Sequence, residues 1–342
     1  MSQRLFFNLE TIPSKKNQAG SLACVTAKEV PGFIDISFNQ LKLNREGFQE
    51  PIWHPNAHKI GYCQQGNALI SLRTPNGLDV FSLEPGDVFF IPKGSAHSIL
   101  NLGEQENIIN FALNSASPEV MYFSKALDSL SDDVFAVTFD TFPTFVNQLK
   151  KAQNSSEMMK MLSSQGHASF FDTSSHKSNP TSQFKFNLEA SHPLLETRGG
   201  YLKSATKTNL SILEGLGILG FELTPKGIVE PHWHTNAGEL VYIEKGRTRI
   251  TVLSPDGNIE ELEVNAGQGA FAAASHFHNI ENIGDENVKV IAFFSNAQPD
   301  YMGFGEVLGS YSNEMLASIF GVSPGYFDKL KKPSGPLVIL PL

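Results

Sequence analysis

The chain has 342 residues, more than the about 250–300 residues that one hydrophobic core usually serves, so two domains are expected. Hydrophobic residues make up 41% of the chain and charged residues 18%, which is enough apolar material for two packed cores. The formal charge of −9, without a block of Lys and Arg, argues against a nucleic-acid surface or a polybasic membrane patch.

The amino-terminal segment, residues 1–18, contains no apolar run of signal-peptide length and no small-residue cleavage pattern. No apolar stretch of the chain is long enough for a membrane-spanning helix. The two cysteines, Cys24 and Cys63, cannot build a disulfide framework and are expected to be small buried hydrophobic residues. A cytoplasmic protein is therefore expected.

Short runs of alternating apolar and polar residues, separated by Gly, Pro, Asn and Asp, recur along the whole chain. Examples lie at 68–72 and 87–91 in the first half, and at 248–253 and 288–294 in the second. Such runs with frequent turns are typical of antiparallel strands in a sandwich or barrel. The sequence therefore predicts an all-β protein.

Turn and helix signals complete this pattern. Pro-Asn-Gly at 75–77 and Pro-Asp-Gly at 255–257 are matching signals for tight hairpins. Helical patterning is expected mainly near 119–131, 143–152 and 312–332. We predict two small β-barrels with short helical appendages.

The two halves of the chain repeat one another. Phe-Asn-Leu-Glu at 7–10 recurs at 186–189, and Trp-His at 53–54 recurs at 233–234, so the spacing stays at 179 or 180 residues. A period this long excludes a solenoid of short repeats. Two homologous domains are therefore expected.

The segment between the repeats is rich in Ser, Asn, Gln, Lys and His and has few apolar residues, which indicates a linker. We predict an N-terminal domain at residues 1–151, a linker at 152–183 and a C-terminal domain at 184–342.

Three histidines and a glutamate in the second half predict a metal site. His232 and His234 are separated by one residue, so a strand places both rings on one face. Glu239 follows the next turn, and His278 would arrive from another strand. Imidazole and carboxylate donors suit Mn, Fe, Zn, Ni or Cu, and four ligands on a six-coordinate ion leave two positions open. The alternative is that these are ordinary barrel histidines satisfied by hydrogen bonds.

The equivalent positions of the first half hold Ile52, His54, Lys59 and His97. Ile52 offers no donor atom, and Lys59 places a cation where the anionic ligand is needed. The first half is therefore expected to hold no metal, and His54 and His97 are expected to be a relic or to line a ligand pocket.

The pattern of ligands and glycines resembles the paired motifs of the cupin superfamily. In the second half one motif runs from Gly227 through the first three ligands to Gly246, and the other from Gly267 through the last ligand to Asn282. Because the chain has two such domains, it is most similar to the bicupins, particularly those of the oxalate decarboxylase family. The resemblance implies two cupin (double-stranded β-helix, or jelly-roll) barrels and a homo-oligomer.

The resemblance carries over the ligand set His232, His234, Glu239 and His278. It implies one divalent metal ion, with manganese as the first expectation and iron, zinc, nickel or copper as alternatives. It also implies a small-molecule carboxylate as substrate or ligand.

The resemblance implies two further groups that this chain lacks. The family's arginine, three residues before the paired histidines, is Val229 here, and its glutamate, fourteen residues after the last ligand, is Ala292. A general acid needs a titratable group within hydrogen-bond reach.

Other side chains are candidates for the lost acid. His276, Asp300 and Glu306 are the candidates in the second half, with a rim position as the alternative for His276. Counting from His97 places the family's loop acid at Glu119, whose alternative role is the start of a helix after Ser-Pro.

Three functions from different classes stay open. The first is a metal-dependent oxidoreductase or decarboxylase that acts on a small carboxylate at a single C-terminal site. The second is a non-enzymatic binding or storage bicupin similar to the seed globulins. The third is a cupin-type sugar isomerase, in which the metal polarises a carbonyl. The retained ligands favour the first.

Overall fold

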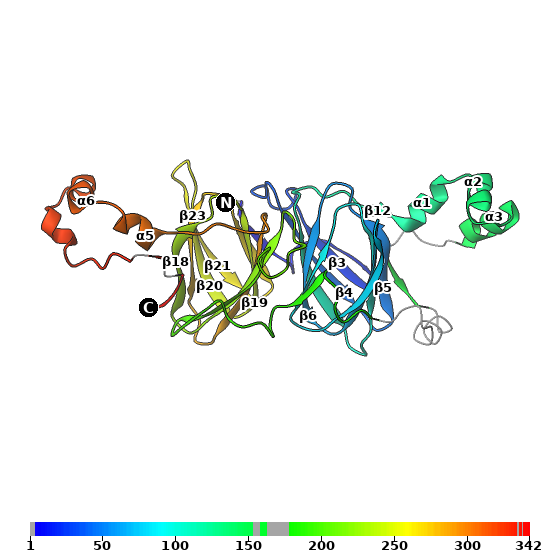
Figure 1. Ribbon diagram of the computed structural model, residues 1–342, viewed down its shortest axis with the longest axis horizontal. Helices are drawn as coiled ribbons and strands as arrows, with labels where there is room; N and C mark the ends of the chain where they lie inside the picture. Colours follow the sequence, from blue (N-terminus) through cyan, green and yellow to red (C-terminus); the bar gives the residue numbers. More distant parts are fainter. Residues whose placement is uncertain (1–3, 153–157, 163–177, 334, 337) are drawn as a thin grey trace. The chain divides into compact units, whose positions relative to one another are not determined.

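The computed structural model describes residues 4–152, 158–162, 178–333, 335–336 and 338–342 (Figure 1). The predicted all-β fold is confirmed, because antiparallel strands in jelly-roll sheets make up most of the regular secondary structure. The chain forms two compact units. We call residues 13–24 and 37–187 the N-terminal unit, and residues 1–12, 25–36 and 188–342 the C-terminal unit.

The N-terminal unit contains two antiparallel sheets. The first has the order β14-β9-β6-β11-β4-β3-β2, with β2 (Ser14–Asn17), β3 (Gly20–Val25), β4 (Ser37–Leu43), β6 (Lys59–Gln65), β9 (Asp87–Ile91), β11 (Asn107–Leu113) and β14 (Lys185–Asn187). The second has the order β12-β5-β10-β7-β8, with β5 (Gly47–Trp53), β7 (Ala68–Thr74), β8 (Gly77–Leu83), β10 (Ala96–Asn101) and β12 (Met121–Tyr122), and β13 (Met159–Met161) also pairs with β5.

The C-terminal unit repeats this arrangement. Its first sheet has the order β1-β22-β19-β24-β17-β16-β15, with β1 (Phe6–Asn8), β15 (Leu195–Thr197), β16 (Gly200–Ala205), β17 (Gly217–Leu223), β19 (Glu239–Lys245), β22 (Gln268–Ala272) and β24 (Val288–Phe294). Its second has the order β21-β20-β23-β18-β25, with β18 (Gly227–Trp233), β20 (Arg247–Leu253), β21 (Ile259–Asn265), β23 (Phe277–Asn282) and β25 (Met302–Gly303), and β26 (Ile339–Pro341) also pairs with β18.

The repeated Phe-Asn-Leu-Glu motif joins a different unit in each copy. In the first copy, β1 pairs with β22 of the C-terminal unit, and Phe7 packs edge-on against Phe33. In the second copy, β14 pairs with β9 of the N-terminal unit. The predicted boundaries at 152 and 183 stay a prediction, whereas the contacts assign residues 1–12 and 25–36, which were predicted to belong to the N-terminal domain, to the C-terminal unit.

Short helices follow each barrel (Figure 1). They are α1 (Phe123–Ser129), α2 (Asp132–Thr138) and α3 (Pro143–Ala152) in the N-terminal unit, and α5 (Phe304–Gly309), α6 (Asn313–Phe320) and the 3-10 helix η2 (Pro324–Phe327) in the C-terminal unit. Ser312 caps the start of α6 by accepting a hydrogen bond from the Met315 amide, and Gly321, with φ +67°, ends it. None of the helices in the described residues is both long and apolar enough to cross a membrane.

The predicted linker, 152–183, is described only in part. Residues 153–157 and 163–177 of it lie outside the described residues, and the described piece between them forms β13, which pairs with β5 from Gly47 to Gln49.

Candidate metal centre

Two strands of one sheet and one strand of the other bring the predicted ligands together. In β18, the side chains of Glu230, His232 and the following His234 are buried, while those of Pro231 and Trp233 between them are partly exposed. This alternation is the period of two that a strand imposes, so both histidines face the barrel interior. The predicted arrangement of the paired histidines therefore matches the structure.

The other two ligands lie beside them. β23 is the antiparallel neighbour of β18, and His278 lies directly opposite His232 in the register. Glu239 is the first residue of β19, in the facing sheet. All four side chains are buried, and one donor atom from each lies within 4.8 Å of the donor atoms of the others.

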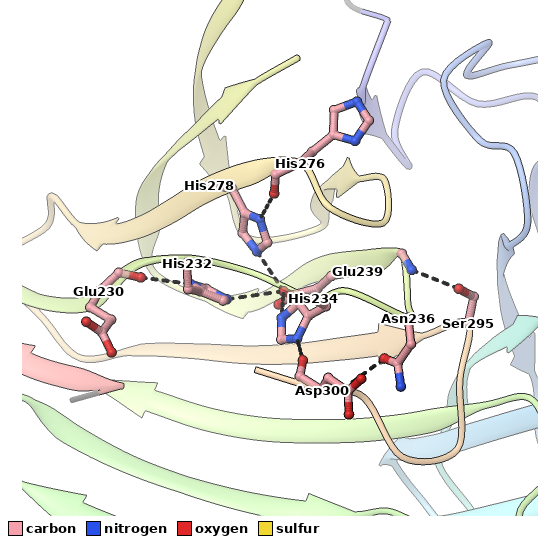
Figure 2. Close-up of polar contacts among 10 residues, drawn as sticks. Glu230, His232, His234, Asn236, Glu239, His276, His278, Ser295 and Asp300 are labelled. Atoms are coloured by element: carbon pink, nitrogen blue, oxygen red, sulfur yellow. Dashed lines mark hydrogen bonds and ion pairs between the residues drawn. The ribbon is translucent and has the colours of Figure 1, made fainter. Parts of the chain in front are cut away.

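The carboxylate of Glu239 is the meeting point of the cluster (Figure 2). Its Oε2 lies 2.9 Å from Nε2 of His278 and 3.0 Å from Nε2 of His234. Nε2 of His232 is 3.8 Å away from the same oxygen. The structure therefore brings all four predicted ligands to one point.

Each histidine ring is oriented by a backbone carbonyl (Figure 2). Nδ1 of His232 donates to the Glu230 carbonyl at 2.7 Å. Nδ1 of His234 donates to the Asp300 carbonyl at 2.5 Å, and Nδ1 of His278 to the His276 carbonyl at 2.8 Å. Such contacts fix the tautomer of a metal-binding histidine and leave the Nε2 lone pair facing the site.

This hydrogen bonding makes the cluster a suitable cation site. Three Nε2 lone pairs and a carboxylate oxygen, all acceptors, converge in a buried space, and acceptors at such distances repel one another unless a cation or protons lie between them. Burial, together with the neighbouring His278, lowers the pKa of His232 to about 4, which favours the neutral ring that binds metals.

The three histidines favour the negatively charged form of the Glu239 carboxyl. Burial alone would raise the pKa of this carboxyl, but its contacts with the His232, His234 and His278 rings, which share protons with it when no cation is bound, hold it well below its usual range. The site therefore offers one anionic and three neutral donors, the set that Mn, Fe or Zn accepts.

The equivalent position in the N-terminal unit has a cationic side chain of its own. Nζ of Lys59 lies 2.6 Å from Nε2 of His97 and 4.5 Å from the centre of the Phe111 ring. Burial lowers the pKa of Lys59 to about 7, and burial with the neighbouring Lys59 lowers that of His54 to about 3. In the part of the chain that the structure describes, only the C-terminal set groups three or more potential ligands.

The candidate acids of the second half lie outside the cluster. The ring of His276 points away from the four donors, and this residue contributes its carbonyl to the His278 ring (Figure 2). The exposed carboxylate of Asp300 accepts a hydrogen bond from Thr235, at 2.8 Å. Glu306 lies in the first turn of α5. As catalytic residues these three stay predictions.

Glu119 supports the N-terminal unit through its backbone. Its carbonyl accepts a hydrogen bond from Nδ1 of His54 at 2.6 Å, as the Asp300 carbonyl does for His234. The expectation that Glu119 starts a helix is wrong, because α1 begins only at Phe123, after the short strand β12.

Two residues beside the cluster were missed by the sequence analysis. The Tyr301 ring stacks on His232, with 4.7 Å between ring centres and 19° between planes, and its hydroxyl donates to Glu230 at 3.3 Å. The Glu230 carboxylate also accepts the backbone amide of Val338 at 3.0 Å. The alternation in β18 could have identified Glu230, whereas no local signal points to Tyr301.

A cavity of about 300 Å³ opens onto the cluster from within the C-terminal unit. His232, His234 and Glu239 line it together with Tyr301. Val229, at the position where the resemblance implies an arginine, also lines this cavity.

Comparisons with known proteins agree with the two-barrel structure. The family model described as Cupin matches residues 7–147 and again residues 186–325. Oxalate decarboxylase OxdC of Bacillus subtilis is 23% identical over 337 residues, which covers 97% of this chain and 86% of that protein. An oxalate decarboxylase of Arthroderma benhamiae is 24% identical over 340 residues, which covers 89% of this chain and 77% of that protein.

A solved structure shows the same fold. This structure of the Bacillus subtilis oxalate decarboxylase, reported for its Mn(II) centres, has a TM-score of 0.84 and 20% sequence identity. The match covers 99% of this chain and 89% of that chain.

Proposed function

Because the chain belongs to the cupin family and is a bicupin that resembles the oxalate decarboxylases, we propose that it is a metal-dependent enzyme with a single metal site, in the C-terminal unit. Its substrate is a small carboxylate. The enzyme breaks the carbon–carbon bond next to the carboxylate group, either by decarboxylation without net oxidation or with oxidation of the substrate. In the oxidative case dioxygen is the electron acceptor. Manganese is the proposed ion, because a relative with the same two-barrel fold is described with Mn(II) centres.

The observation that carries this proposal is the convergence of four buried acceptors, each histidine among them held by a backbone carbonyl. A storage or purely structural protein gains nothing from burying a carboxylate among three imidazole lone pairs, because such a group is costly without a cation. When bound, a divalent ion supplies charge neutralisation for a substrate carboxylate and leaves coordination positions open to it.

The surrounding residues determine what reaches the ion. The cavity admits only molecules small enough to fit its volume. The Tyr301 ring lies against His232, and its hydroxyl donates a hydrogen bond to Glu230. Burial, with the nearby Glu230 carboxylate, raises the pKa of Tyr301, so its hydroxyl stays neutral and can donate a hydrogen bond.

Metal content tests the proposed single site. We expect protein purified without a metal-affinity tag and loaded with Mn(II) to contain about one equivalent by elemental analysis, since only one donor set is complete. Glu239→Ala and His278→Ala should remove it. The matched control is His97→Ala, at the equivalent position of the N-terminal unit, which should leave the metal content unchanged. Two equivalents in the wild type would contradict the single site.

Activity separates an enzyme from a binding protein. Carbon dioxide release and oxygen uptake are measured with a panel of carboxylates on the metal-loaded protein. Turnover that disappears in Glu239→Ala supports the proposal. A protein that keeps its metal and binds carboxylates without turnover would instead be a non-enzymatic ligand-binding bicupin.

A further inference from the structure

The cavity above the metal donors has a clear depth gradient. Leu194, which is 70% exposed, lies at its mouth with the exposed Thr208 and Gln298. The buried His232 and Glu239 lie at its base. With about 300 Å³, the cavity has the liquid volume of roughly ten water molecules, more than a two-carbon dicarboxylate requires.

The walls between the mouth and the base are mainly hydrocarbon. The apolar side chains that form them are Leu202, Leu219, Phe221, Val229, Phe294 and Ile339. The polar groups among the lining residues away from the donors are neutral hydroxyls and one amide. No lysine or arginine lines the cavity among the residues that the structure describes.

The charge of the loaded site favours a ligand with one negative charge. Metal ligands bind in their deprotonated forms, so a divalent ion held by one carboxylate and three neutral imidazoles has a net charge of about +1. One carboxylate neutralises this charge. A second carboxylate would lie unpaired in the apolar part of the cavity, which is strongly unfavourable.

We propose that the cavity takes a monocarboxylate with a hydrocarbon tail and a second oxygen on the carbon next to the carboxylate, such as a 2-oxo acid. The carboxylate and the adjacent oxygen face the metal donors, and the tail lies along the wall formed by Leu202, Phe221 and Val229. This inference rests on the proposed function, because it specifies the substrate class of the same site.

The apolar wall determines how much the affinity should change with the length of the ligand's tail. Burying one methylene tightens binding roughly fourfold. Affinity for the loaded protein should therefore rise with each added methylene until the cavity is full. Oxalate has no tail and two charges, so it gains nothing from the wall.

Calorimetric titration of the Mn(II)-loaded protein tests the proposal with oxalate and with straight-chain 2-oxo acids from pyruvate to 2-oxooctanoate. We expect affinity to increase about fourfold per methylene over the first members, and 2-oxohexanoate to bind more tightly than oxalate. An affinity that does not depend on chain length, no binding of any of these acids, or tighter binding of oxalate than of every 2-oxo acid would overturn it.

Variants of the wall provide a second, independent readout. Leu202→Ala should weaken 2-oxohexanoate binding about tenfold and leave pyruvate binding nearly unchanged. The control is Leu22→Ala, because Leu22 occupies the same position of β3 that Leu202 occupies in β16, in the other barrel. Equal losses in both variants would overturn the proposal. Val229→Arg should reverse the preference and strengthen oxalate binding.

These measurements separate the inference from the proposed function. Chain-length-dependent binding without turnover supports the substrate class and contradicts the enzyme. Failure of the protein to take up metal contradicts the proposed function, and the chain-length series is then measured on the metal-free protein, in which the apolar wall is still present. A flat series there overturns the inference as well.

Discussion

Lys59 is a fully buried lysine at the first position of β6, where the other barrel has Glu239 at the first position of β19. Its ammonium contacts Nε2 of His97 and the ring of Phe111. At the level of single residues, the difference between Glu239 and Lys59 therefore explains best why we expect the two barrels to differ in metal binding. A basic side chain occupies the buried position at which the other barrel has its anionic ligand.

The pKa of Lys59 gives this difference a pH dependence. Burial lowers the pKa from 10.5 in the unfolded chain to about 7 in the folded one. Between these values the unfolded state binds the extra proton, so stability should rise with pH in that window, by up to about 1.4 kcal/mol per pH unit. Below pH 7 the full cost of burying the charged Lys59 lowers the stability, and above pH 10.5 this cost is absent.

Urea unfolding at several pH values between 6 and 10 measures this effect. In a Trp233→Phe background, Trp53 of β5 is the remaining tryptophan and reports the N-terminal unit. Lys59→Met, which has a similar shape and no charge, should lack the increase in unfolding free energy between pH 7 and 10. Identical pH profiles for the two proteins would show that Lys59 is not titrating in this range.

His232, His234 and Glu239 could be predicted from the sequence because their signal is local, whereas His278 was identified through the family resemblance. The spacing of His232 and His234 matches a strand, and the repeat supplies a comparison with His54 and His97. Tyr301 could not be found in this way. It reaches His232 from a segment more than sixty residues further along the chain, and its position in the first half is a valine, Val120.

At the scale of elements, the positions of the strands could be predicted from the sequence, but the partners of the edge strands β1 and β14 could not. Alternating apolar residues located β7, β9, β20 and β24, whose bounds match the predicted runs closely. The two Phe-Asn-Leu-Glu segments were identified as equivalents, but their sequences do not say which sheet each joins. An edge strand pairs with whatever edge the tertiary structure offers, so local sequence carries little information about its partner.

The pairing of β1 predicts a long-range effect of Phe7. This side chain is buried, and it packs against Phe33, which in turn packs against Phe271 of β22. We expect Phe7→Ala to destabilise the C-terminal unit by about 3 kcal/mol or more, although residue 7 is at the other end of the sequence. In a Trp53→Phe background, Trp233 fluorescence in urea reports this unit.

The control uses the repeated motif. Phe186→Ala, at the equivalent position of β14, should lower the stability of the N-terminal unit and leave the Trp233 transition in place. If Phe7→Ala instead lowered the stability of the N-terminal unit alone, the assignment of β1 to the C-terminal unit would be incorrect.

At the scale of the whole molecule, the helical appendages carry apolar side chains that their own unit leaves exposed. In α3 and the turn before it, Phe142 is 77% exposed and Phe145 50%. In α6, Ile319 is 65% exposed and Phe320 60%. Single exposed apolar residues are ordinary, but larger exposed apolar patches are a feature of surfaces that contact another molecule. The homo-oligomer that the family resemblance implies stays a prediction, and these exposed side chains are where we expect the chains to meet.

Sedimentation velocity at micromolar concentration tests this assembly. We expect the wild type to sediment as a species larger than 37.5 kDa, and Phe145→Glu or Ile319→Glu to shift it toward the monomer, since a charge cannot be buried unpaired in an apolar interface. Leu78→Glu is the matched control, because Leu78 is 57% exposed in the β7–β8 hairpin, away from the helices in sequence. A wild type that stays monomeric at the highest concentration measured would show that these helices serve another purpose than self-association. A shift in Leu78→Glu equal to that in Ile319→Glu would show that the hairpin contributes as much as the helices do.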